Sequence, residues 1–400
     1  MSAAAEQRDG EVLLRRSYKF RLRPTCQQES RLVEMLGDFC DLYNAALQER
    51  RDAWKVCGHP VRMGEQSADL PWIRANLEQH GRWSAWAQQE VLRRLDRAFQ
   101  AFFRRVKAGQ TPGYPRFKSK ARWDSAVLCQ SNGARWIADT SRVSIVGVGH
   151  VKVHAHRTMK GRVKTITVRR EGRHWYAVFS CDQVPAEPLP ATGAEVGVDV
   201  GINSFAATSD NELVPNPRHA RRSSDKLAAL QRAHAATGRR SKKRHRQISE
   251  LHRKIARQRR DHHHKTARSL VNSYDTIVVE KLTVANMVRR PQPKPDPDRH
   301  GQWLPNGAAA KTGLNRSISD AGWAQFLNIL DAKAEEAGRR VIRVPAHHTS
   351  QTCANCGHVH ASNRDGEAFQ CRSCGHTAHA DINAAINILR RGLAPQQAAA

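Results

Sequence analysis

The sequence predicts a multidomain protein of the mixed α+β and α/β class, and three observations support this. Short β patterns dominate residues 126–181, with one long helical region before them, whereas strand and helix patterns alternate later in the chain. A proline-rich polar segment, residues 182–193, separates the two halves. Near the C-terminus, two Cys-x-x-Cys-Gly turns predict a small ribbon held by a metal. We therefore expect a β-barrel-like domain with a helical insertion, followed by an α/β core with an inserted four-cysteine zinc ribbon.

The composition favours a polyanion as partner. The 400 residues carry a formal net charge of +29, which the phosphates of a nucleic acid would compensate. An anionic membrane surface is the competing partner, but no long basic amphipathic helix has a wide apolar face. No apolar run approaches the ~20 residues that span a bilayer, and the N-terminus lacks a signal-peptide apolar region. We expect a cytoplasmic, nucleoid-associated protein with no membrane partner and with reduced cysteines outside the two turns.

The N-terminal region reads as one strand followed by helices. Residues 12–23 alternate apolar and basic side chains, as a strand does, and Pro24 and Thr25 end the pattern. Helical spacing of apolar residues then covers the region from Leu32 to Leu47 and residues 84–107. Between these helices, residues 57–82 are irregular and polar. The first strand can join the later β patterns, which makes the helical region an insertion between strands.

Residues 108–120 are predicted to form a loop, because glycine and proline recur in it. Basic and aromatic side chains interleave there, as in surfaces that contact both the backbone and the bases of a nucleic acid. An ordinary basic connector is the alternative. The candidate nucleic-acid contacts are Tyr114, Arg116, Phe117, Lys118 and Lys120.

After this loop, five short β patterns predict a small antiparallel barrel or sheet. They cover residues 126–128, 143–145, 150–154, 164–169 and 175–180.

The second half begins with a predicted hairpin whose first strand, residues 194–201, carries Asp199 at its centre. Residues 221–268 then hold 17 Lys and Arg against three acids, in a largely helical pattern broken near Thr237. A solvated charged helix is the alternative, but this excess favours a helical hairpin that faces a polyanion. Its candidate contacts are Arg239, Arg240, Lys242, Lys243 and Arg244. A metal site at His262–His264 is disfavoured, because consecutive residues point in different directions around a helix.

Further along, residues 275–280 form a buried-type strand that ends in Glu280. Residues 291–305 are proline-rich and predict a flexible loop. Helical spacing follows over residues 320–338, then a strand over residues 340–344. Residues 392–400 are predicted to be a disordered tail.

Two matched cysteine pairs, Cys353 with Cys356 and Cys371 with Cys374, lie 14 residues apart. Four thiolates complete a tetrahedral Zn²⁺ sphere, so this zinc would be structural and not catalytic. The glycine after each second cysteine permits the tight turn that directs backbone amides at sulfur. A redox role is the alternative, which the presence of two matched pairs disfavours.

Three acids complete the candidate set: Asp199, Glu280 and Asp381. Each has an ordinary explanation when taken singly, and for Asp381 it is an N-cap of the last helix. Together, in a strongly basic chain, they fit a two-metal nuclease, in which two Mg²⁺ ions ~4 Å apart need several clustered carboxylates.

The order of these elements resembles an RNase H-like, RuvC-type nuclease core. The chain as a whole resembles the TnpB family of transposon-encoded proteins, which is related to type V CRISPR effectors. The segments that carry the resemblance are YKFRLRPT (18–25), LYNAAL (42–47), GYPRFKSK (113–120), GVDVGINSFAATS (197–209), VVEKL (278–282), TSQTCANCG (349–357) and CRSCGHTAHADINAAINIL (371–389). One departure is Ala380, where many relatives carry arginine.

The resemblance implies RNA-guided cleavage of double-stranded DNA beside a short motif, with a guide RNA from the transposon end. It assigns Asp199, Glu280 and Asp381 to catalysis with two Mg²⁺ ions. It also implies a wedge β domain (1–24 and 111–188), a helical recognition insertion (25–110), a RuvC-like domain (189–352 and 376–391) and a zinc ribbon (353–375). A non-catalytic nucleic-acid-binding regulator of transposition and a strand-transfer transposase are the alternatives.

Overall fold

The computed structural model describes residues 6–8, 11–237, 241–299 and 301–394. The chain divides into two compact units, Met1–Pro185 and Ala186–Ala400. This division falls inside the proline-rich segment that the sequence marked as a boundary. Among the described residues, no helix is both long enough and apolar enough to cross a membrane.

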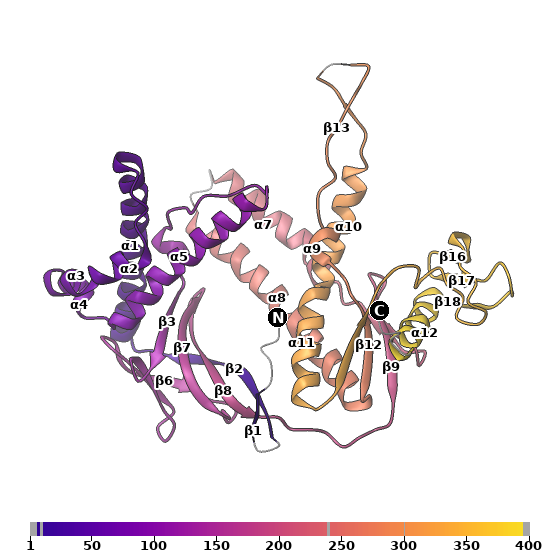
Figure 1. The fold of residues 1–400 in the computed structure, drawn as a ribbon, viewed down its shortest axis with the longest axis horizontal. Helices are drawn as coiled ribbons and strands as arrows, with labels where there is room; N and C mark the ends of the chain where they lie inside the picture. The colour runs from indigo at the N-terminus through magenta and orange to yellow at the C-terminus, as the bar shows by residue number, and fades with distance from the viewer. Residues whose placement is uncertain (1–5, 9–10, 238–240, 300, 395–400) are drawn as a thin grey trace. The chain divides into compact units, whose positions relative to one another are not determined.

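The first unit is built on a closed β-barrel (Figure 1). Its strands are β1 (Glu6–Arg8), β2 (Glu11–Arg23), β3 (Ser125–Gln130), β4 (Gly133–Ile137), β5 (Arg142–Ile145), β6 (Gly149–His154), β7 (Arg162–Glu171) and β8 (His174–Pro185). The order β2-β6-β5-β4-β3-β7-β8 closes because β8 also pairs with β2, and β1 only extends β2. The β3–β4 pair is parallel and the other pairs of the ring are antiparallel.

Alternation of side chains explains why these segments form a barrel. In β8, Trp175, Ala177 and Phe179 are buried, whereas the residues between them are more exposed. Phe20 of β2 contacts Phe179 inside, with 5.9 Å between ring centroids. The predicted joining of the first strand to the later ones is therefore confirmed, while β4 was not predicted because its pattern, GARWI, is short and begins with glycine.

A helical insertion separates β2 from β3, as the sequence predicted. It comprises α1 (Cys26–Cys57), α2 (Met63–Ala68), α3 (Leu70–Asn76), α4 (Glu78–Gly81), α5 (Ala85–Lys107) and the short 3₁₀ turn η1 (Lys120–Arg122). Thr25 begins α1 with a capping box to Gln28, and Gly58 ends it in a left-handed conformation. The expectation of an irregular segment over residues 57–82 is wrong in detail, because three short helices occupy most of it. The buried Arg50 of α1 ties α2 and α5 together, because its Nε donates to Gln66 and its Nη1 to Asp96.

The second unit contains a five-stranded mixed sheet in the order β11-β10-β9-β12-β15. The strands are β9 (Glu195–Val200), β10 (Ser204–Thr208), β11 (Leu213–Pro215), β12 (Thr276–Glu280) and β15 (Arg340–Val344). The predicted β9–β10 hairpin is confirmed, and β12 pairs in parallel with both β9 and β15. The short edge strand β11 was not predicted.

Helices cover both faces of this sheet. The described helices of this unit are α6 (His219–Arg222), α7 (Ser224–Ala236), α8 (Lys242–Ser273), α9 (Val284–Met287), α10 (Ala308–Ala321), α11 (Trp323–Glu336) and α12 (Ala380–Leu393), of which α8 and α11 cover one face and α12 the other. On one face, Val198 and Val279 pack against α8 and α11 through residues such as Leu270 and Phe326. On the other face, Val278 of β12 packs against Ile388 of α12. Because side chains alternate along a strand, each central strand contributes to both cores.

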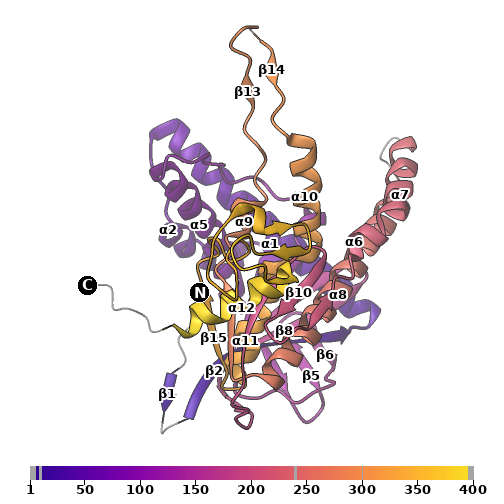
Figure 2. The ribbon, with the colours of Figure 1, turned by 90° about the vertical axis from the view of Figure 1, so that its right-hand side faces the viewer.

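Two sequence expectations for this unit need correction. The loop expected at 291–305 contains a short hairpin, β13 (Lys294–Pro295) with β14 (Trp303–Leu304), which projects away from the sheet of its unit (Figures 1 and 2). Residues 392 and 393 do not belong to the tail expected from residue 392, because α12 continues to Leu393 and Gly392 packs closely against Val278. Residues 395–400 lie outside the described residues.

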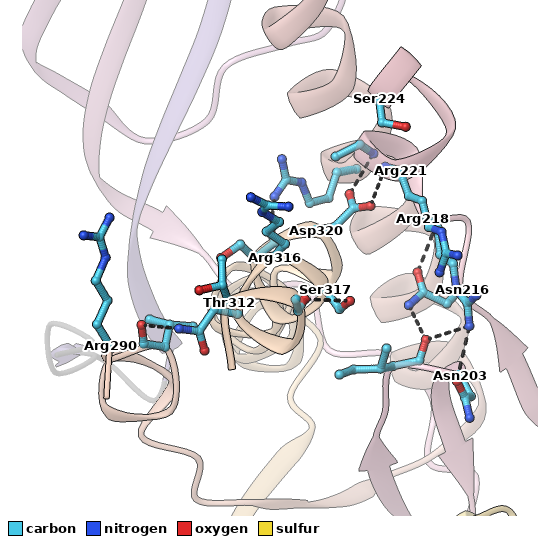
Figure 3. A pocket seen from close by; sticks show the side chains of 17 residues that line it. Asn203, Asn216, Arg218, Arg221, Ser224, Arg290, Thr312, Arg316, Ser317 and Asp320 are labelled. Atoms are coloured by element: carbon cyan, nitrogen blue, oxygen red, sulfur yellow. Dashed lines mark hydrogen bonds between the residues drawn. The ribbon is translucent and has the colours of Figure 1, made fainter. Parts of the chain in front are cut away.

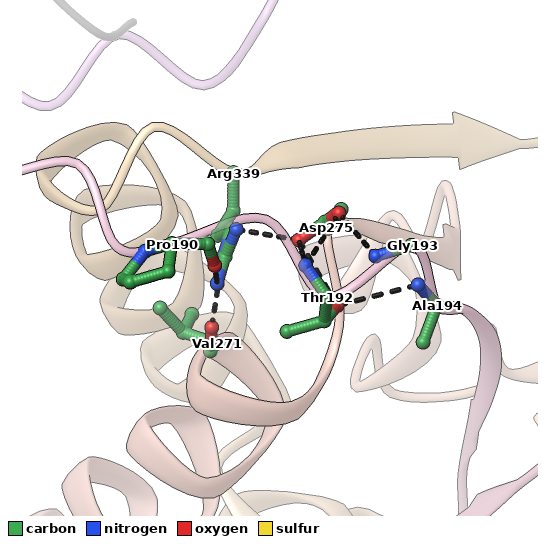
Figure 4. Close-up of polar contacts among 7 residues, drawn as sticks. All are labelled: Pro190, Thr192, Gly193, Ala194, Val271, Asp275 and Arg339. Atoms are coloured by element: carbon green, nitrogen blue, oxygen red, sulfur yellow. Dashed lines mark hydrogen bonds and ion pairs between the residues drawn. The ribbon is translucent and has the colours of Figure 1, made fainter.

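A polar network at the start of the sheet fixes the segment that leads into β9 (Figure 4). Arg339, with a buried side chain, donates to Asp275 (2.5 Å), to Pro190 O (2.8 Å) and to Val271 O (3.1 Å). Asp275 in turn accepts from the backbone amides of Thr192 and Gly193. The network ties the end of α8, the start of β12 and the chain before β9 to one another.

Candidate active site and metal centre

Strand register brings Asp199 and Glu280 side by side. Val198 of β9 is paired with Val279 of β12, and Asp199 and Glu280 are the next residues on these parallel strands. Val198 and Val279 point into the core on the α8 and α11 face. The alternation of a strand therefore places Asp199 and Glu280 on the opposite face, which α12 covers.

The third acid, Asp381, lies in the first turn of α12 against the end of β9. A Cβ added at Gly201 would be 3.5 Å from its Oδ2, and Asp381 is only 6% exposed. The N-cap of α12 is His379, whose Nδ1 accepts from the Asp381 amide, so the simple capping explanation for Asp381 is wrong. The structure thus brings all three predicted acids to one end of the sheet.

Close approach of α12 to β9 depends on a glycine. A Cβ at Gly197 would lie 2.0 Å from Ala385 O and 2.7 Å from Leu389 N, both in the backbone of α12. The absence of a side chain at this position lets the helix that carries Asp381 rest directly on the strand that carries Asp199.

The electrostatics show that the acids interact. Burial first of all, together with the negative charges of Glu280 and Asp381, raises the pKa of Asp199 from 3.8 to about 8. Burial also raises the pKa of Glu280, against the opposing effects of a 2.6 Å hydrogen bond from the Thr349 hydroxyl and the charge of Arg391. Three carboxylates in a partly buried place favour protons or cations near them.

One cation in this place was missed by the sequence reasoning. Arg364, in β16 (Arg364–Asp365) of the ribbon, donates from Nη2 to Asp381 Oδ1 at 2.7 Å, and its charge lowers the pKa of Asp199. Nothing in the local sequence around Arg364 distinguishes it from the other arginines. Its role follows only from the fold of the ribbon, which returns this residue to the start of α12.

The donor set at the three acids fits Mg²⁺ in kind, because it consists of carboxylate oxygens. The carboxylate oxygens are not as tightly grouped as the cysteine sulfurs. In the described part of the chain, the four cysteines are the one group of potential metal ligands in which three or more ligand atoms lie close together. Mg²⁺ commonly binds through one or two carboxylates with several waters, so a looser set is compatible with it.

The four predicted cysteines form a compact group suited to binding one metal ion. Their sulfur atoms all lie within 4.8 Å of one another, with Cys353 Sγ 3.7 Å from Cys374 Sγ and Cys356 Sγ 3.6 Å from Cys371 Sγ. A tetrahedron with Zn–S bonds of ~2.3 Å has S···S edges of ~3.8 Å. The spacing therefore fits Zn²⁺ with a closed coordination sphere.

Backbone geometry supports the same conclusion. Gly357 and Gly375 have φ of 78° and 72°, and each donates its amide to the carbonyl of the first cysteine in its turn. Amides of Asn355 and Ser373 point at cysteine sulfurs, as predicted. Hydrogen bonds, first of all from the backbone at His376, lower the pKa of Cys374 to about 6, which favours the thiolate that a metal requires.

The ribbon around this centre is small. It contains η2 (Ala361–Asn363), β16, β17 (Ala368–Gln370) and β18 (Thr377–His379), the three strands forming one antiparallel sheet. Ala380 is fully buried there, and its amide donates to Glu367 O. The ribbon leads directly into α12, so its fold sets the position of Asp381 in the first turn of that helix.

The predicted nucleic-acid loop is irregular and its aromatic side chains are accessible. Tyr114 is 44% and Phe117 46% exposed, while Lys118 is held by backbone hydrogen bonds with Asn44. Lys120 forms an ion pair with Asp41 (2.6 Å), so its charge is partly satisfied. Contact of this loop with nucleic acid remains a prediction.

The second basic segment is a pair of contacting helices, α7 and α8, as predicted. Lys242, Lys243 and Arg244 begin α8 after the N-cap Ser241, while Arg239 and Arg240 lie outside the described residues. His263 is buried between Phe205 and Phe326, and its Nε2 pairs with Ala321 O. Within the histidine run, His263 therefore belongs to the core contact of α8. This agrees with the sequence argument against a metal site at His262–His264.

Parts of this chain match family models, and nearly all of it matches known relatives. Residues 176–290 match a family model, OrfB_IS605, described as "Probable transposase". Residues 323–388 match the Cas12f1-like TNB domain. A protein of Escherichia coli K12 described as "Putative RNA-guided DNA endonuclease InsQ" is 32% identical over 383 residues, covering 94% of this chain and 92% of its own. The chain belongs to the TnpB family.

Other matches agree with TnpB membership. A Streptomyces pristinaespiralis protein with the description of an RNA-guided DNA endonuclease is 31% identical and covers 95% of this chain and 90% of its own. Residues 14–58 match a model described as "Helix-turn-helix domain", although here they hold β2 and the continuous helix α1. A structure of the mini-RNA-guided endonuclease CRISPR-Cas_phi3 has a TM-score of 0.46 and 13% identity over 95% and 92% of the two chains, a likeness too loose to add to the family assignment.

Proposed function

We propose that this TnpB-family chain is an RNA-guided DNA endonuclease that hydrolyses phosphodiester bonds with two Mg²⁺ ions. The observation that carries the proposal is the meeting of Asp199, Glu280 and Asp381 at one end of the sheet. A raised Asp199 pKa beside two further carboxylates is the electrostatic signature of a site that needs cations. Relatives described as RNA-guided DNA endonucleases support the choice of substrate and guide.

Each site residue has a role in this proposal. Bound Mg²⁺ would supply the positive charge that stabilises the transition state of in-line phosphodiester hydrolysis. Asp199, Glu280 and Asp381 would hold the ions, and Thr349 orients Glu280 through its hydroxyl. Arg364 orients Asp381 and adds positive charge where the scissile phosphate would lie.

The four cysteines would hold a structural Zn²⁺ that orders the ribbon and the start of α12. The second unit would then be a RuvC-type core (189–352 and 376–391) with the zinc ribbon (353–375) inserted. The barrel would be the wedge domain (1–24 and 111–188), and its insertion (25–110) the recognition domain. Guide RNA from the transposon end and a double-stranded DNA target beside a short motif would be the partners.

Cleavage of a target plasmid by protein copurified with its guide RNA tests this function. We expect Mg²⁺-dependent cutting that requires the matching target, and no cutting by Asp199→Ala. As a charge-matched control, Asp139→Asn alters an exposed acid of the first unit and should cut normally. Binding of the target without any cutting by wild type would instead support a non-catalytic regulator.

A further inference from the structure

A pocket of about 1050 Å³ in the second unit is lined mainly by polar and basic side chains (Figure 3). It lies between four parts of the chain: the β9–β10 turn, the region of α6, helix α10, and the segment that follows α9. Five arginines from these elements and from α8 line it: Arg218, Arg221, Arg259, Arg290 and Arg316.

The charge in this pocket is strongly unbalanced. Asp320 is the acid in its lining, and its carboxylate accepts from the backbone amides of Ala220 (2.8 Å) and Arg221 (3.1 Å). Five guanidinium groups around one occupied carboxylate favour an anion with several negative charges.

Two arginines are held in place by the protein, whereas three are available. Arg218 reaches Asn203 Oδ1 at 3.3 Å, and Arg259 donates to Ser319 O. The guanidinium groups of Arg221, Arg290 and Arg316 have no hydrogen-bond or ion-pair partner among the residues that the structure describes. They come from three separate elements around the pocket, so they can contact successive phosphates instead of one (Figure 3).

The lining also indicates which part of a nucleic acid fits. Among the described residues, no aromatic side chain lines the pocket, so these residues offer no stacking surface for a base. Asn203, Asn216 and Thr312 provide amide and hydroxyl groups of the kind that contact phosphate and sugar. The ligand that this chemistry recognises is a phosphodiester backbone, read without regard to sequence.

The position of the pocket relates it to the acids. Ile202 and Asn203, in its lining, belong to the turn that directly follows β9, which carries Asp199. We propose that the arginine pocket binds the phosphodiester backbone of a nucleic-acid strand at the turn that follows β9. Nucleic acid as the ligand rests on the proposed function, whereas the pocket itself is a separate site with its own test.

A pair of matched double variants provides that test. Arg221→Gln with Arg290→Gln removes two of the available pocket charges. Arg222→Gln with Arg289→Gln removes two exposed arginines at the adjacent positions, outside the lining. Both variants have the same net charge, and thermal unfolding establishes that both are folded.

Binding of fluorescein-labelled single-stranded DNA and of RNA of the same sequence is measured by anisotropy on the full chain, in Mg²⁺-free buffer, over a range of salt. Each lost phosphate contact lowers the slope of log K against log salt by ~0.7. We expect the pocket variant to lose ~1.4 from the slope and the control to keep the wild-type slope. If the slope falls only for DNA, the pocket binds the target strand. If it falls only for RNA, the pocket binds the guide. If it falls for both, the pocket binds either backbone whatever its sugar.

An unchanged slope for the pocket variant, or an equal loss for the control, would overturn the proposal. Plasmid cleavage by the guide-loaded wild type separates the two hypotheses. Cleavage with an unchanged pocket slope means that the pocket proposal alone has failed. A lost slope without wild-type cleavage means that the proposed nuclease function has failed and the backbone site stands.

Discussion

Asp199 is the residue on which the proposed chemistry of the site depends most, because its carboxylate is surrounded by protein and by two further acids. Its raised pKa, about 8 instead of 3.8, means that the metal-free protein keeps this group protonated at neutral pH. A group with a raised acid pKa binds more protons in the folded than in the unfolded state. The metal-free fold therefore loses stability as pH rises from about 4 to 8.

Cation binding at this residue should be strongly pH-dependent. Below about pH 8, Mg²⁺ must displace a proton from Asp199, whereas above it the carboxylate is already charged. We expect Mg²⁺ to raise the melting temperature more at about pH 8.5 than at about pH 6.5, measured by calorimetry. Asp199→Asn should abolish the difference. An equal Mg²⁺ effect at both pH values in wild type would contradict the assignment.

Arg364 should affect catalysis more than folding, because it is the cation paired with Asp381. Arg364→Ala leaves this carboxylate without its partner and removes a charge that lowers the pKa of Asp199. We expect at least a ~10-fold slower cleavage rate, equivalent to ~1.4 kcal/mol of transition-state stabilisation. The matched control is Arg372→Ala in the same ribbon, whose side chain donates to the Ser362 carbonyl and to no carboxylate among the described residues. Equal rates for the two variants would show that Arg364 has no special role.

At the scale of elements, the contact between α12 and β9 determines whether the acids meet. Gly197→Ala would place a methyl group 2.0 Å from Ala385 O, so helix and strand must separate. We expect destabilisation of about 3 kcal/mol or more in denaturant unfolding, since backbone cannot yield as a side chain does. Gly313→Ala in α10 meets nothing within 4 Å and should instead gain about 0.5–1 kcal/mol. Similar stabilities for the two variants would contradict the packing described.

The ribbon proposed to hold zinc is the second decisive element, since it carries Arg364 and leads into Asp381. Cys371→Ser should lower bound zinc, measured by elemental analysis, and should abolish cleavage by releasing both residues from position. The isolated thiol Cys57→Ser, exposed on α1, is the control and should retain zinc and activity. Full cleavage by a zinc-free Cys371→Ser protein would refute the structural role of the ribbon.

At the scale of the whole molecule, much of this organisation could be predicted from the sequence. Alternating apolar residues indicated most strands, and the spacing of cysteines indicated their metal centre. The sequence could not reveal β4 and β11, because such short strands have too few alternating residues to be recognised. Helix α10 was also missed: only Ile318 and Ala321 of it are buried, so its apolar pattern is weak.

The candidate site, like the fold, could be predicted from the sequence only in part. The three acids were predicted because each follows or interrupts an apolar pattern, and a family resemblance connected them. Arg364 and the arginine pocket could not be predicted, because their partners are distant in sequence. Arg316 and Arg221, for example, are brought to one cavity only by the packing of α10 near α6. Chain-wide positive charge, by contrast, gave no indication of which arginines bind.

The central claim is that three acids form one cleaving site, and the most direct measurement is plasmid cleavage by guide-loaded single variants. Asp199→Asn, Glu280→Gln and Asp381→Asn each remove one negative charge with little change of shape. All three variants should bind the target but cut it at least ~10³-fold more slowly than the wild type and Asp139→Asn do. Wild-type cutting by any one of the three would contradict the central claim.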